Sequence, residues 1–421
     1  EAQGLLSLPF MATIRLSEST ELAWPVLAVA PMVGQCDPPF RELCRRYGAT
    51  LVYTEMLKAE ELAWNERYRR DALSVRDSGP LLVQVCTRDP EAFAAAGLVA
   101  KSYGAAGIDL NLGCPQLRAR EGSYGAYLAE DWDLCEAIVR RGKEVLGPDF
   151  AVTAKLRIQS EGPAATLAFA KRLVDAGADL LALHARYRGR TDARRDGAAD
   201  LDVVRLLVDG SGVPVLSNGN VRRGDDVRHN LTQTRASGVL VAEEILRYPA
   251  LFRDVVLTTS SSSRPLAPPP EQPPPTSRRR ARLLGEYLDL CLDFEQREAL
   301  PREDRSGRVK HGNHLRAPSL PDDAGRYSNW WPNVEVVKQH SKHMVTVDEP
   351  AGALVDLFQR TTFRKAVSVR QIDAYLRKRL RLPPPVDDAV AEEPAVDDDD
   401  PIPPAHTLFF QGNDDDCSCE E

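Results

Sequence analysis

The chain has 421 residues with a formal net charge of −8, and 43% of its residues are hydrophobic. Its eight cysteines are irregularly spaced in a long chain without a recognisable secretory or transmembrane segment. This pattern argues against a secreted disulfide scaffold and against a membrane protein. We therefore expect reduced thiols and a cytoplasmic location, with the nucleus or an organelle as alternatives.

Residues 1–23 are expected to form an N-terminal extension, and eight short apolar runs follow within residues 24–256. Each run ends in a polar or sulfur-bearing residue. Stretches with helical spacing separate them, at Pro90–Tyr103, Asp131–Leu146, Pro163–Ala176 and Asp202–Leu207. Such alternation implies parallel pairing, and eight units match a closed (β/α)8 TIM barrel better than a doubly wound sheet of five or six strands. The expected strands are Val26–Met32, Thr50–Met56, Leu81–Val85, the run within Gly107–Gln116, Ala151–Ile158, Leu180–Arg186, Val213–Gly219 and Gly238–Glu243.

The residues that end these strands should face one pocket, because the chemistry of such barrels lies at the carboxyl rim of the strands. They include one thiol, one lysine, one imidazole and several amides, but no metal-ligand cluster. Amides suit the edge of a flat heteroaromatic cofactor, a lysine suits a developing anion, and the last two loops suit a phosphate. The pattern favours a flavin over a metal. The set is Met32, Glu55, Gln84, Asn111, Cys114, Lys155, Arg157, His184, Asn218 and Glu243.

Each key residue also has a structural interpretation. A cysteine is by default a small buried hydrophobe, but Cys114 lies between a glycine and a proline where a strand becomes a loop, which favours a reactive thiol. Lys155 has the alternative of a surface ion pair at a strand end, although lysine is rarely buried without a task. His184 has the alternative of a hydrogen-bonded core histidine.

Eight motifs follow one another along the expected barrel. They are Ala30-Pro-Met-Val-Gly-Gln35, Tyr47-Gly-Ala-Thr50, Tyr53-Thr-Glu-Met56, Asn111-Leu-Gly-Cys-Pro-Gln116, Tyr124-Gly-Ala126, Thr153-Ala-Lys-Leu-Arg157, Ser217-Asn-Gly-Asn220 and Pro249-Ala-Leu-Phe252. In this order they resemble blocks of the tRNA-dihydrouridine synthases, flavin enzymes that reduce specific uridines in tRNA. The Met-Val-Gly-Gln form and the glutamine after Cys-Pro resemble the eukaryotic subgroup that acts on positions 16 and 17 of the D-loop.

The resemblance implies FMN as cofactor and NADPH as its reductant. It also implies that hydride passes from reduced flavin to C6 of uracil while Cys114 protonates C5 as the general acid. A thiol with a pKa near 8.5 is mostly protonated at neutral pH and is a better acid than a hydroxyl. The cofactor-binding residues that the resemblance implies are Pro31, Met32, Val33, Gln84, Asn111, Lys155, His184, Asn218, Gly219, Asn220, Ala242 and Glu243.

Three positions depart from the family pattern. Glu244 stands where a glycine usually follows Ala-Glu, and a carboxylate there would repel the flavin phosphate. Ala185 replaces a glycine after the histidine, and Ser123 replaces a histidine of the subgroup. The loop at Tyr187–Arg190 is lengthened or reshaped, and electrostatic compensation for Glu244 is expected from three arginines. These are Arg186, Arg188 and Arg190.

Residues 257–276 are rich in serine and proline and are expected to be a linker. The resemblance implies a small helical tRNA-binding domain at 277–382, with an irregular insert at about 301–324. Helical spacing is expected at Leu283–Ala299, Val334–His343, Ala351–Thr361 and Val367–Leu382. The residues expected to bind tRNA, or else to form solvated helix faces, are Arg157, Arg278, Arg279, Arg280, Lys338, Arg364, Lys365, Arg377, Lys378 and Arg379.

Residues 383–421 carry 13 acidic residues and no lysine or arginine, so the remainder has a net charge of +5. An acidic disordered tail on a basic folded portion explains how a negatively charged chain can still bind RNA. The pairs His311/His314 and His340/His343 lack a nearby cysteine and zinc-finger spacing, so no metal site is expected.

The leading hypothesis is a monomeric, FMN- and NADPH-dependent tRNA-dihydrouridine synthase that acts on D-loop uridines and has no membrane partner. One alternative is a flavin-poor descendant that binds tRNA without reducing it. The other is an FMN-dependent small-molecule reductase of the dihydroorotate dehydrogenase type.

Overall fold

The computed structural model describes residues 13–73, 77–188, 197–255, 277–298, 302–303, 309–310, 334–345 and 369–380. These residues fall into two compact units. The first holds the strands of the large sheet with their helices, and the second holds the helices of the C-terminal region together with residues 246–248. Each unit is described by itself.

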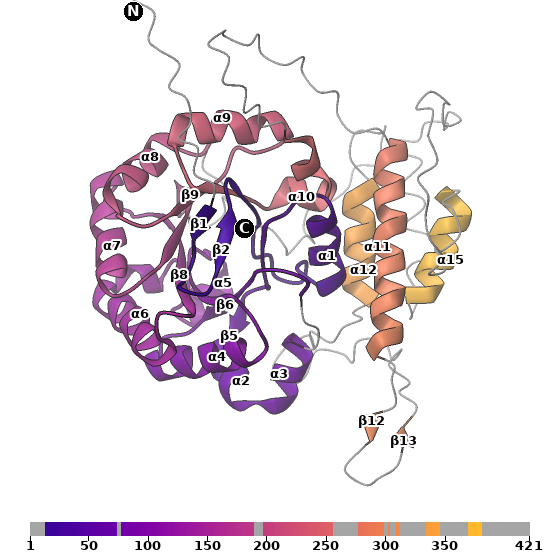
Figure 1. Ribbon diagram of the computed structural model, residues 1–421, viewed down its shortest axis with the longest axis horizontal. Helices are drawn as coiled ribbons and strands as arrows, with labels where there is room; N and C mark the ends of the chain where they lie inside the picture. Colours follow the sequence, from indigo (N-terminus) through magenta and orange to yellow (C-terminus); the bar gives the residue numbers. More distant parts are fainter. Residues whose placement is uncertain are drawn as a thin grey trace, which may run out of the picture. The chain divides into compact units, whose positions relative to one another are not determined.

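Eight parallel strands close into a barrel in the first unit (Figure 1). The order β4-β3-β11-β10-β9-β8-β7-β6 is completed by the pairing of β4 with β6. The predicted (β/α)8 fold is confirmed. The barrel strands are β3 (Val26–Val29), β4 (Leu51–Tyr53), β6 (Leu81–Cys86), β7 (Gly107–Leu112), β8 (Ala151–Ile158), β9 (Leu180–Tyr187), β10 (Val215–Asn218) and β11 (Gly238–Val241), and the two-residue β5 (Leu57–Lys58) pairs with β6.

Helices surround the barrel, and several begin at a side-chain cap. Asp89 accepts a hydrogen bond from the Glu91 N–H, and Asp131 accepts one from the Leu134 N–H, as is typical of N-cap residues. The helices are α1 (Pro38–Arg46), α2 (Ala59–Trp64), α3 (Glu66–Ala72), α4 (Pro90–Ser102), α5 (Leu117–Glu121), α6 (Trp132–Leu146), α7 (Pro163–Asp175), α8 (Leu201–Gly210), α9 (Gly224–Thr234) and α10 (Glu243–Arg247), with 3-10 turns η1 (Leu128–Glu130) and η2 (Leu251–Asp254).

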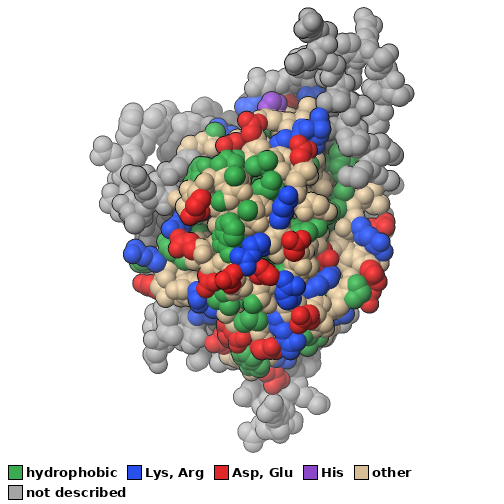
Figure 2. Space-filling model, turned by 90° about the vertical axis from the view of Figure 1, so that its left-hand side faces the viewer, with side chains coloured by type: hydrophobic (Ala, Val, Ile, Leu, Met, Phe, Trp, Pro, Cys, Tyr) green, Lys and Arg blue, Asp and Glu red, His purple; other side chains and the backbone are tan. Residues whose placement is uncertain are grey.

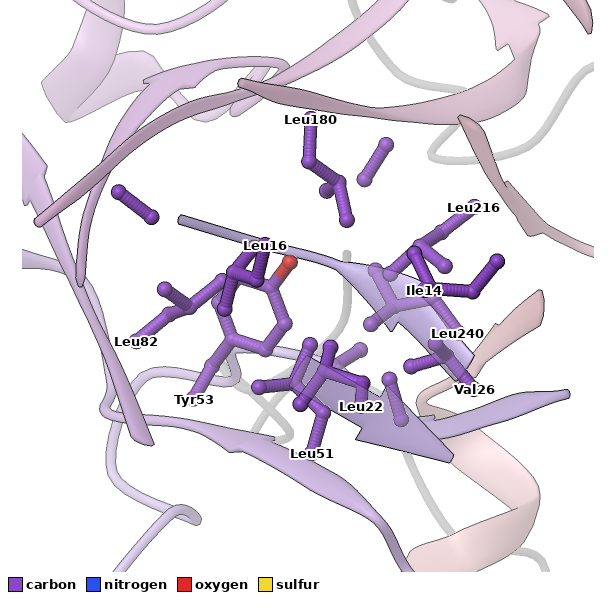
Figure 3. Close-up of a cluster of buried hydrophobic side chains, with 14 residues drawn as sticks. Ile14, Leu16, Leu22, Val26, Leu51, Tyr53, Leu82, Leu180, Leu216 and Leu240 are labelled. Atoms are coloured by element: carbon purple, nitrogen blue, oxygen red, sulfur yellow. The ribbon is translucent and has the colours of Figure 1, made fainter. Parts of the chain in front are cut away.

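A short hairpin covers the amino end of the barrel. Strands β1 (Thr13–Arg15) and β2 (Glu21–Ala23) pair antiparallel and bury Ile14 and Leu22 among side chains from the first residues of the barrel strands (Figure 3). The expected N-terminal extension thus contributes to the core, which the sequence did not reveal because each strand has only three residues. With this end filled by apolar side chains, a site can open only at the other rim.

The face of the barrel that carries α7 is not basic. Figure 2 shows lysine and arginine side chains interspersed with acidic ones on this face. Ion pairs link neighbouring helices there, for example Arg172 to Asp133 and Glu136. Among the described residues, no helix is long and apolar enough to cross a membrane.

The second unit contains three described helices, α11 (Ser277–Glu298), α12 (Val334–Val345) and α15 (Val369–Leu380). Tyr287 of α11 is buried against the edge of the His340 ring, at 5.0 Å between centroids. Arg377 of α15 pairs with Asp373 and with Asp289 of α11. The insert expected to be irregular contains two short paired strands, β12 (Arg302–Glu303) and β13 (Val309–Lys310). The linker, the helix expected at Ala351–Thr361, the pair His311/His314 and the acidic tail lie outside the described residues.

Gly238 begins β11 where no side chain fits. A Cβ there would lie 2.1 Å from the Val26 carbonyl oxygen. We expect Gly238→Ala to lower the free energy of unfolding by about 2–3 kcal/mol, because backbone of an adjacent barrel strand must shift. Gly104 is the control, since its φ is +82° but a Cβ there meets nothing within 4 Å. Gly104→Ala should cost only about 1 kcal/mol, the cost of a left-handed backbone. Equal losses in urea unfolding would contradict this account.

Candidate active site

Polar side chains from five neighbouring strands meet at the carboxyl rim of the barrel. The strand register pairs Asn111 of β7 with Lys155 of β8, and it pairs His184 of β9 with Asn218 of β10. Gln84 of β6 lies opposite Asp109 of β7. Each of these side chains is at most 5% exposed. The rim residues expected from the sequence are therefore neighbours.

Cys114 lies on a loop whose backbone is fixed by hydrogen bonds. The N–H groups of Gly113 and Cys114 both donate to Asn111 Oδ1, at 3.1 and 2.9 Å. The Cys114 carbonyl accepts from the Ala126 N–H at 3.0 Å. Gly125 packs directly on this backbone, since a Cβ there would lie 2.7 Å from the Cys114 oxygen. Cys114 is 8% exposed, and its backbone is held on both sides.

Arg157 anchors the same loop. Its Nε donates to the Gly113 carbonyl at 2.7 Å, its Nη1 donates to the Tyr187 carbonyl at 3.4 Å, and the residue is 3% exposed. We expected Arg157 to contact the substrate. The described contacts join the loop after β7 to the last residue of β9, and the contact with substrate stays a prediction.

The loop after β3 carries Pro31, Met32 and Val33, and a buried network supports it. Gly34 N–H donates to Glu55 Oε2 at 2.8 Å, and the Met32 N–H donates to the Cys36 sulfur at 3.2 Å. Met32 is buried, whereas Val33 is 43% exposed. Burial raises the pKa of Glu55 to about 7, and the Gly34 N–H partly offsets this rise.

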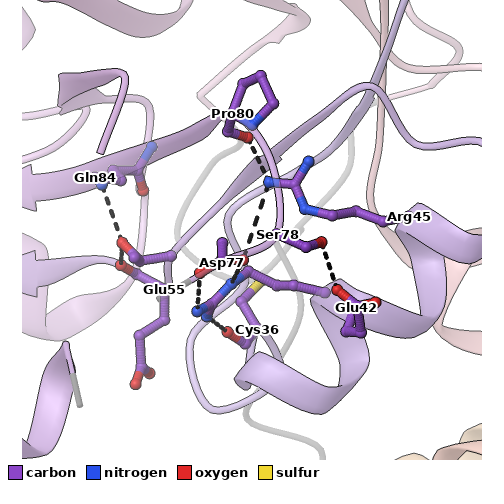
Figure 4. Close-up of polar contacts among 10 residues, drawn as sticks. Cys36, Glu42, Arg45, Glu55, Asp77, Ser78, Pro80 and Gln84 are labelled. Atoms are coloured by element: carbon purple, nitrogen blue, oxygen red, sulfur yellow. Dashed lines mark hydrogen bonds and ion pairs between the residues drawn. The ribbon is translucent and has the colours of Figure 1, made fainter. Parts of the chain in front are cut away.

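An ion pair that the sequence did not predict holds this loop from behind. Arg41 of α1 binds both carboxylate oxygens of Asp77, at 2.8 and 2.7 Å, and also donates to the Cys36 carbonyl (Figure 4). Both side chains are at most 5% exposed. A buried bidentate pair of this kind fixes geometry. Neither residue lies at a strand end, so the pattern of strand ends gave no signal for them.

A second polar cluster lies at the ends of β9 and β10, where a phosphate was expected. Arg186 donates to His184 Nε2 at 2.9 Å, to the Gly197 carbonyl at 2.9 Å and to Asn220 Oδ1 at 3.3 Å. A guanidinium only donates, so Nε2 of His184 accepts and the ring proton lies on Nδ1. Gly219 and Asn220 both have positive φ, +126° and +59°.

This cluster fits an anion. A Cβ on Gly219 would lie 2.6 Å from the Ala199 Cβ and 3.7 Å from Arg186 Nη1, so only glycine lets the backbone after β10 pass this close to Ala199 and the guanidinium. The Arg186 guanidinium beside this turn supplies the positive charge that a phosphate needs. The residues present therefore fit the phosphate of a flavin mononucleotide.

Arg188, which was also expected to compensate for the charge of Glu244, has different surroundings. Arg188 stacks on the Tyr127 ring, 4.4 Å from its centroid, and pairs with Glu130. It thus holds the segment that backs Cys114, whereas Arg190 lies outside the described residues. Ala242 and Glu243 follow β11, and Glu244 lies in the first turn of α10.

The basic residues expected to bind tRNA divide by burial. Arg280 and Lys338 are 3% and 6% exposed, and Arg377 is paired with two aspartates, so these three serve the packing of the helical unit. Lys378 and Arg379 are exposed on α15. Arg279 is exposed and stacks on Tyr248 at 5.1 Å. Arg278 lies in α11, and Arg364 and Lys365 lie outside the described residues.

Comparison with known proteins places the barrel among described families. The sequence model of the dihydrouridine synthase family matches residues 28–282. A tRNA-dihydrouridine(16/17) synthase-like protein of Rattus norvegicus is 40% identical over 227 residues, which cover 53% of this chain and 51% of the relative. The tRNA-dihydrouridine(16/17) synthase of Schizosaccharomyces pombe is 37% identical over 54% of this chain and 57% of its own length.

The corresponding enzyme of Saccharomyces cerevisiae is 39% identical over 54% of each chain. The names of all three relatives include NAD(P)(+). The matched segments span about half the length of these curated relatives. The family match at residues 28–282 includes Cys114 and Lys155.

Glu55 should make stability depend on pH. Its pKa is raised from 4.5 to about 7 in the folded protein, so the fold favours the protonated carboxyl. This contribution is present below pH 4.5 and is lost as the pH rises through about 7. We expect the wild type to lose on the order of 2 kcal/mol relative to Glu55→Gln between pH 5 and pH 8. Unfolding midpoints of the two proteins at four pH values measure this loss, and parallel curves would contradict it.

Proposed function

The chain belongs to the dihydrouridine synthase family, and from that premise we propose that it reduces D-loop uridines of tRNA, at positions 16 and 17, with FMN and NADPH. The observation that carries the proposal is a thiol, Cys114, held by its backbone at the same rim as the buried Lys155. The likeness to synthases of positions 16 and 17 supports the choice of substrate.

Bound FMN would supply the hydride for C6 of uracil. Gln84, Asn111 and Lys155 would hold its ring, since amides match the edge of the isoalloxazine and a buried ammonium stabilises negative charge on it. Met32 and Val33 offer apolar contact. Arg186 would supply the positive charge for the phosphate, beside His184, Gly219 and Asn220.

Cys114 would donate the proton to C5. Uracil that has accepted hydride at C6 carries enolate-like charge, which a nearby acid must quench. The fixed backbone of the loop would present the Cys114 side chain to the base. Arg157 donates to the Gly113 carbonyl and so would help to position this acid, beside the contact with substrate expected of it.

The target base must leave its stack to reach this pocket, at a cost on the order of a few kcal/mol. Three exposed apolar side chains at the same rim offer contact to unstacked bases. They are Val33 after β3, Leu117 after β7 and Tyr187 at the end of β9. Contacts of this type are how single-stranded bases are usually held.

The helical unit would add phosphate contacts through Arg279, Lys378 and Arg379, which are exposed. The protein would act as a monomer on tRNA, in the cytoplasm. The excess of basic residues outside the acidic tail supports a polyanionic partner.

Arg186 offers a test of the cofactor. We expect Arg186→Ala to weaken FMN binding by about tenfold or more and to leave riboflavin binding unchanged, because only FMN carries the phosphate. Arg188→Ala is the matched control, since that arginine stacks on Tyr127. Quenching of flavin fluorescence by the apoprotein measures both affinities. Failure to bind either flavin would support the tRNA-binding descendant, for which Glu244 is the motivating residue.

Cys114→Ser should keep bound flavin and lose at least about 100-fold in dihydrouridine formation with NADPH on unmodified tRNA, because a hydroxyl is a much weaker acid than a thiol. Cys135→Ser is the control, since that thiol is buried on α6 and donates to the Leu128 carbonyl. Equal activity of the two variants would exclude the acid role. NADPH oxidation with orotate-like substrates, which still carry the C5=C6 bond, but not with tRNA would favour the small-molecule reductase.

A further inference from the structure

Asp109 is a buried carboxylate without a role in the reaction proposed above. It lies in the middle of β7 and is 0% exposed. Its Oδ1 accepts from the Thr153 hydroxyl at 2.6 Å, and its Oδ2 accepts from Gln84 Nε2 at 2.8 Å. A charge is costly to bury, so such a residue calls for a reason.

The loop that carries Cys114 determines the direction of the Asn111 side chain. The N–H groups of Gly113 and Cys114 can only donate, so Asn111 must turn its Oδ1 toward them. Its Nδ2 then points the other way and donates to Gln84 Oε1 at 2.8 Å. The direction of the Asn111 amide is thus set by the backbone of the loop.

The direction of the Gln84 amide determines which kind of group must stand at position 109. Since Gln84 Oε1 accepts from Asn111, the Gln84 amide presents Nε2 at its other side. Nε2 can only donate, so the next group must accept. A carboxylate offers only acceptor atoms, so Asp109 accepts the hydrogen bond that Gln84 Nε2 must donate. Reversal of either amide would set donors against donors in a buried site, where unmatched polar groups are costly.

We propose that Asp109 is a positioning residue that fixes the direction of the Gln84 and Asn111 amides and, through them, the backbone of Cys114. The value of this arrangement for catalysis rests on the proposed function, because the two amides and the thiol are the groups that would face flavin and uracil. The arrangement itself is a property of the folded chain.

The first test compares an apolar replacement of Asp109 itself with an apolar replacement of Thr153, its hydrogen-bond partner on the side away from Gln84. Asp109→Leu removes the acceptor that faces Gln84. Thr153→Val removes the hydroxyl on the far side and leaves that acceptor in place. Hydrogen exchange of peptide amides at residues 111–116 and the alkylation rate of Cys114 by iodoacetamide, mapped by mass spectrometry, are the measurements. Neither of these two measurements requires flavin or tRNA.

We expect Asp109→Leu to speed exchange at Gly113 and Cys114 by about tenfold or more and to change the alkylation rate of Cys114. Thr153→Val should stay within about threefold of the wild type in both measurements. Equal behaviour of the two variants would overturn the proposal. Alkylation of Cys135 reports general loosening of the fold.

A second pair of variants decides the matter if Asp109→Leu does not fold. Gln84→Glu sets two carboxylates against each other and should loosen the loop by about tenfold in exchange. Adding Asp109→Asn restores a donor opposite Glu at position 84, while that carboxylate still accepts from Asn111. The double variant should therefore return to within about threefold of the wild type. Losses that add in the double variant would overturn the proposal.

The outcomes of this experiment are separate from those of the proposed function. Rescue by the double variant together with an inactive, flavin-free wild type would keep the role of Asp109 and reject the reductase. Active wild type with additive losses would do the reverse.

Discussion

Closure of the barrel by the pairing of β4 with β6 is the constraint on which the site depends. Parallel strands that close on themselves bring the carboxyl ends of all eight strands to one rim. The β1/β2 hairpin fills the other end with apolar side chains. Gln84, Asn111, Lys155 and His184 thus become neighbours although 100 residues separate the first from the last. No local interaction in the chain brings them together.

Three arginines hold loops around this rim in place. Arg41 binds Asp77 behind the loop after β3, Arg157 joins the loop after β7 to the end of β9, and Arg188 stacks on Tyr127 behind Cys114. A planar guanidinium with several donors can hold two or three carbonyl or carboxylate oxygens at once. Basic residues in a chain that is proposed to bind RNA therefore divide between its own structure and its ligand.

Within the fold, the eight strands and their order followed from short apolar runs that alternate with helical segments. Strand ends were less accurate: β3 ends at Val29 and β4 at Tyr53, whereas the apolar pattern continued to Met32 and Met56. Ala30 and Met32 are buried in the loop after β3, so burial rather than pairing made these residues apolar. The β1/β2 hairpin escaped notice because three-residue strands give almost no periodic signal.

The sequence by itself determined the fold class, the rim residues and the thiol, because strand periodicity and the position of each strand end are local properties of the chain. Only the tertiary structure decided which groups contact one another. It placed Arg157 and Arg188 against the backbone around Cys114 and Arg186 beside His184 and Asn220, and it buried Arg280 and Lys338. It also showed that Asp109 begins a chain of amides that ends at Cys114. Hydrogen-bond direction depends on donors and acceptors from different strands, and no single segment contains that information.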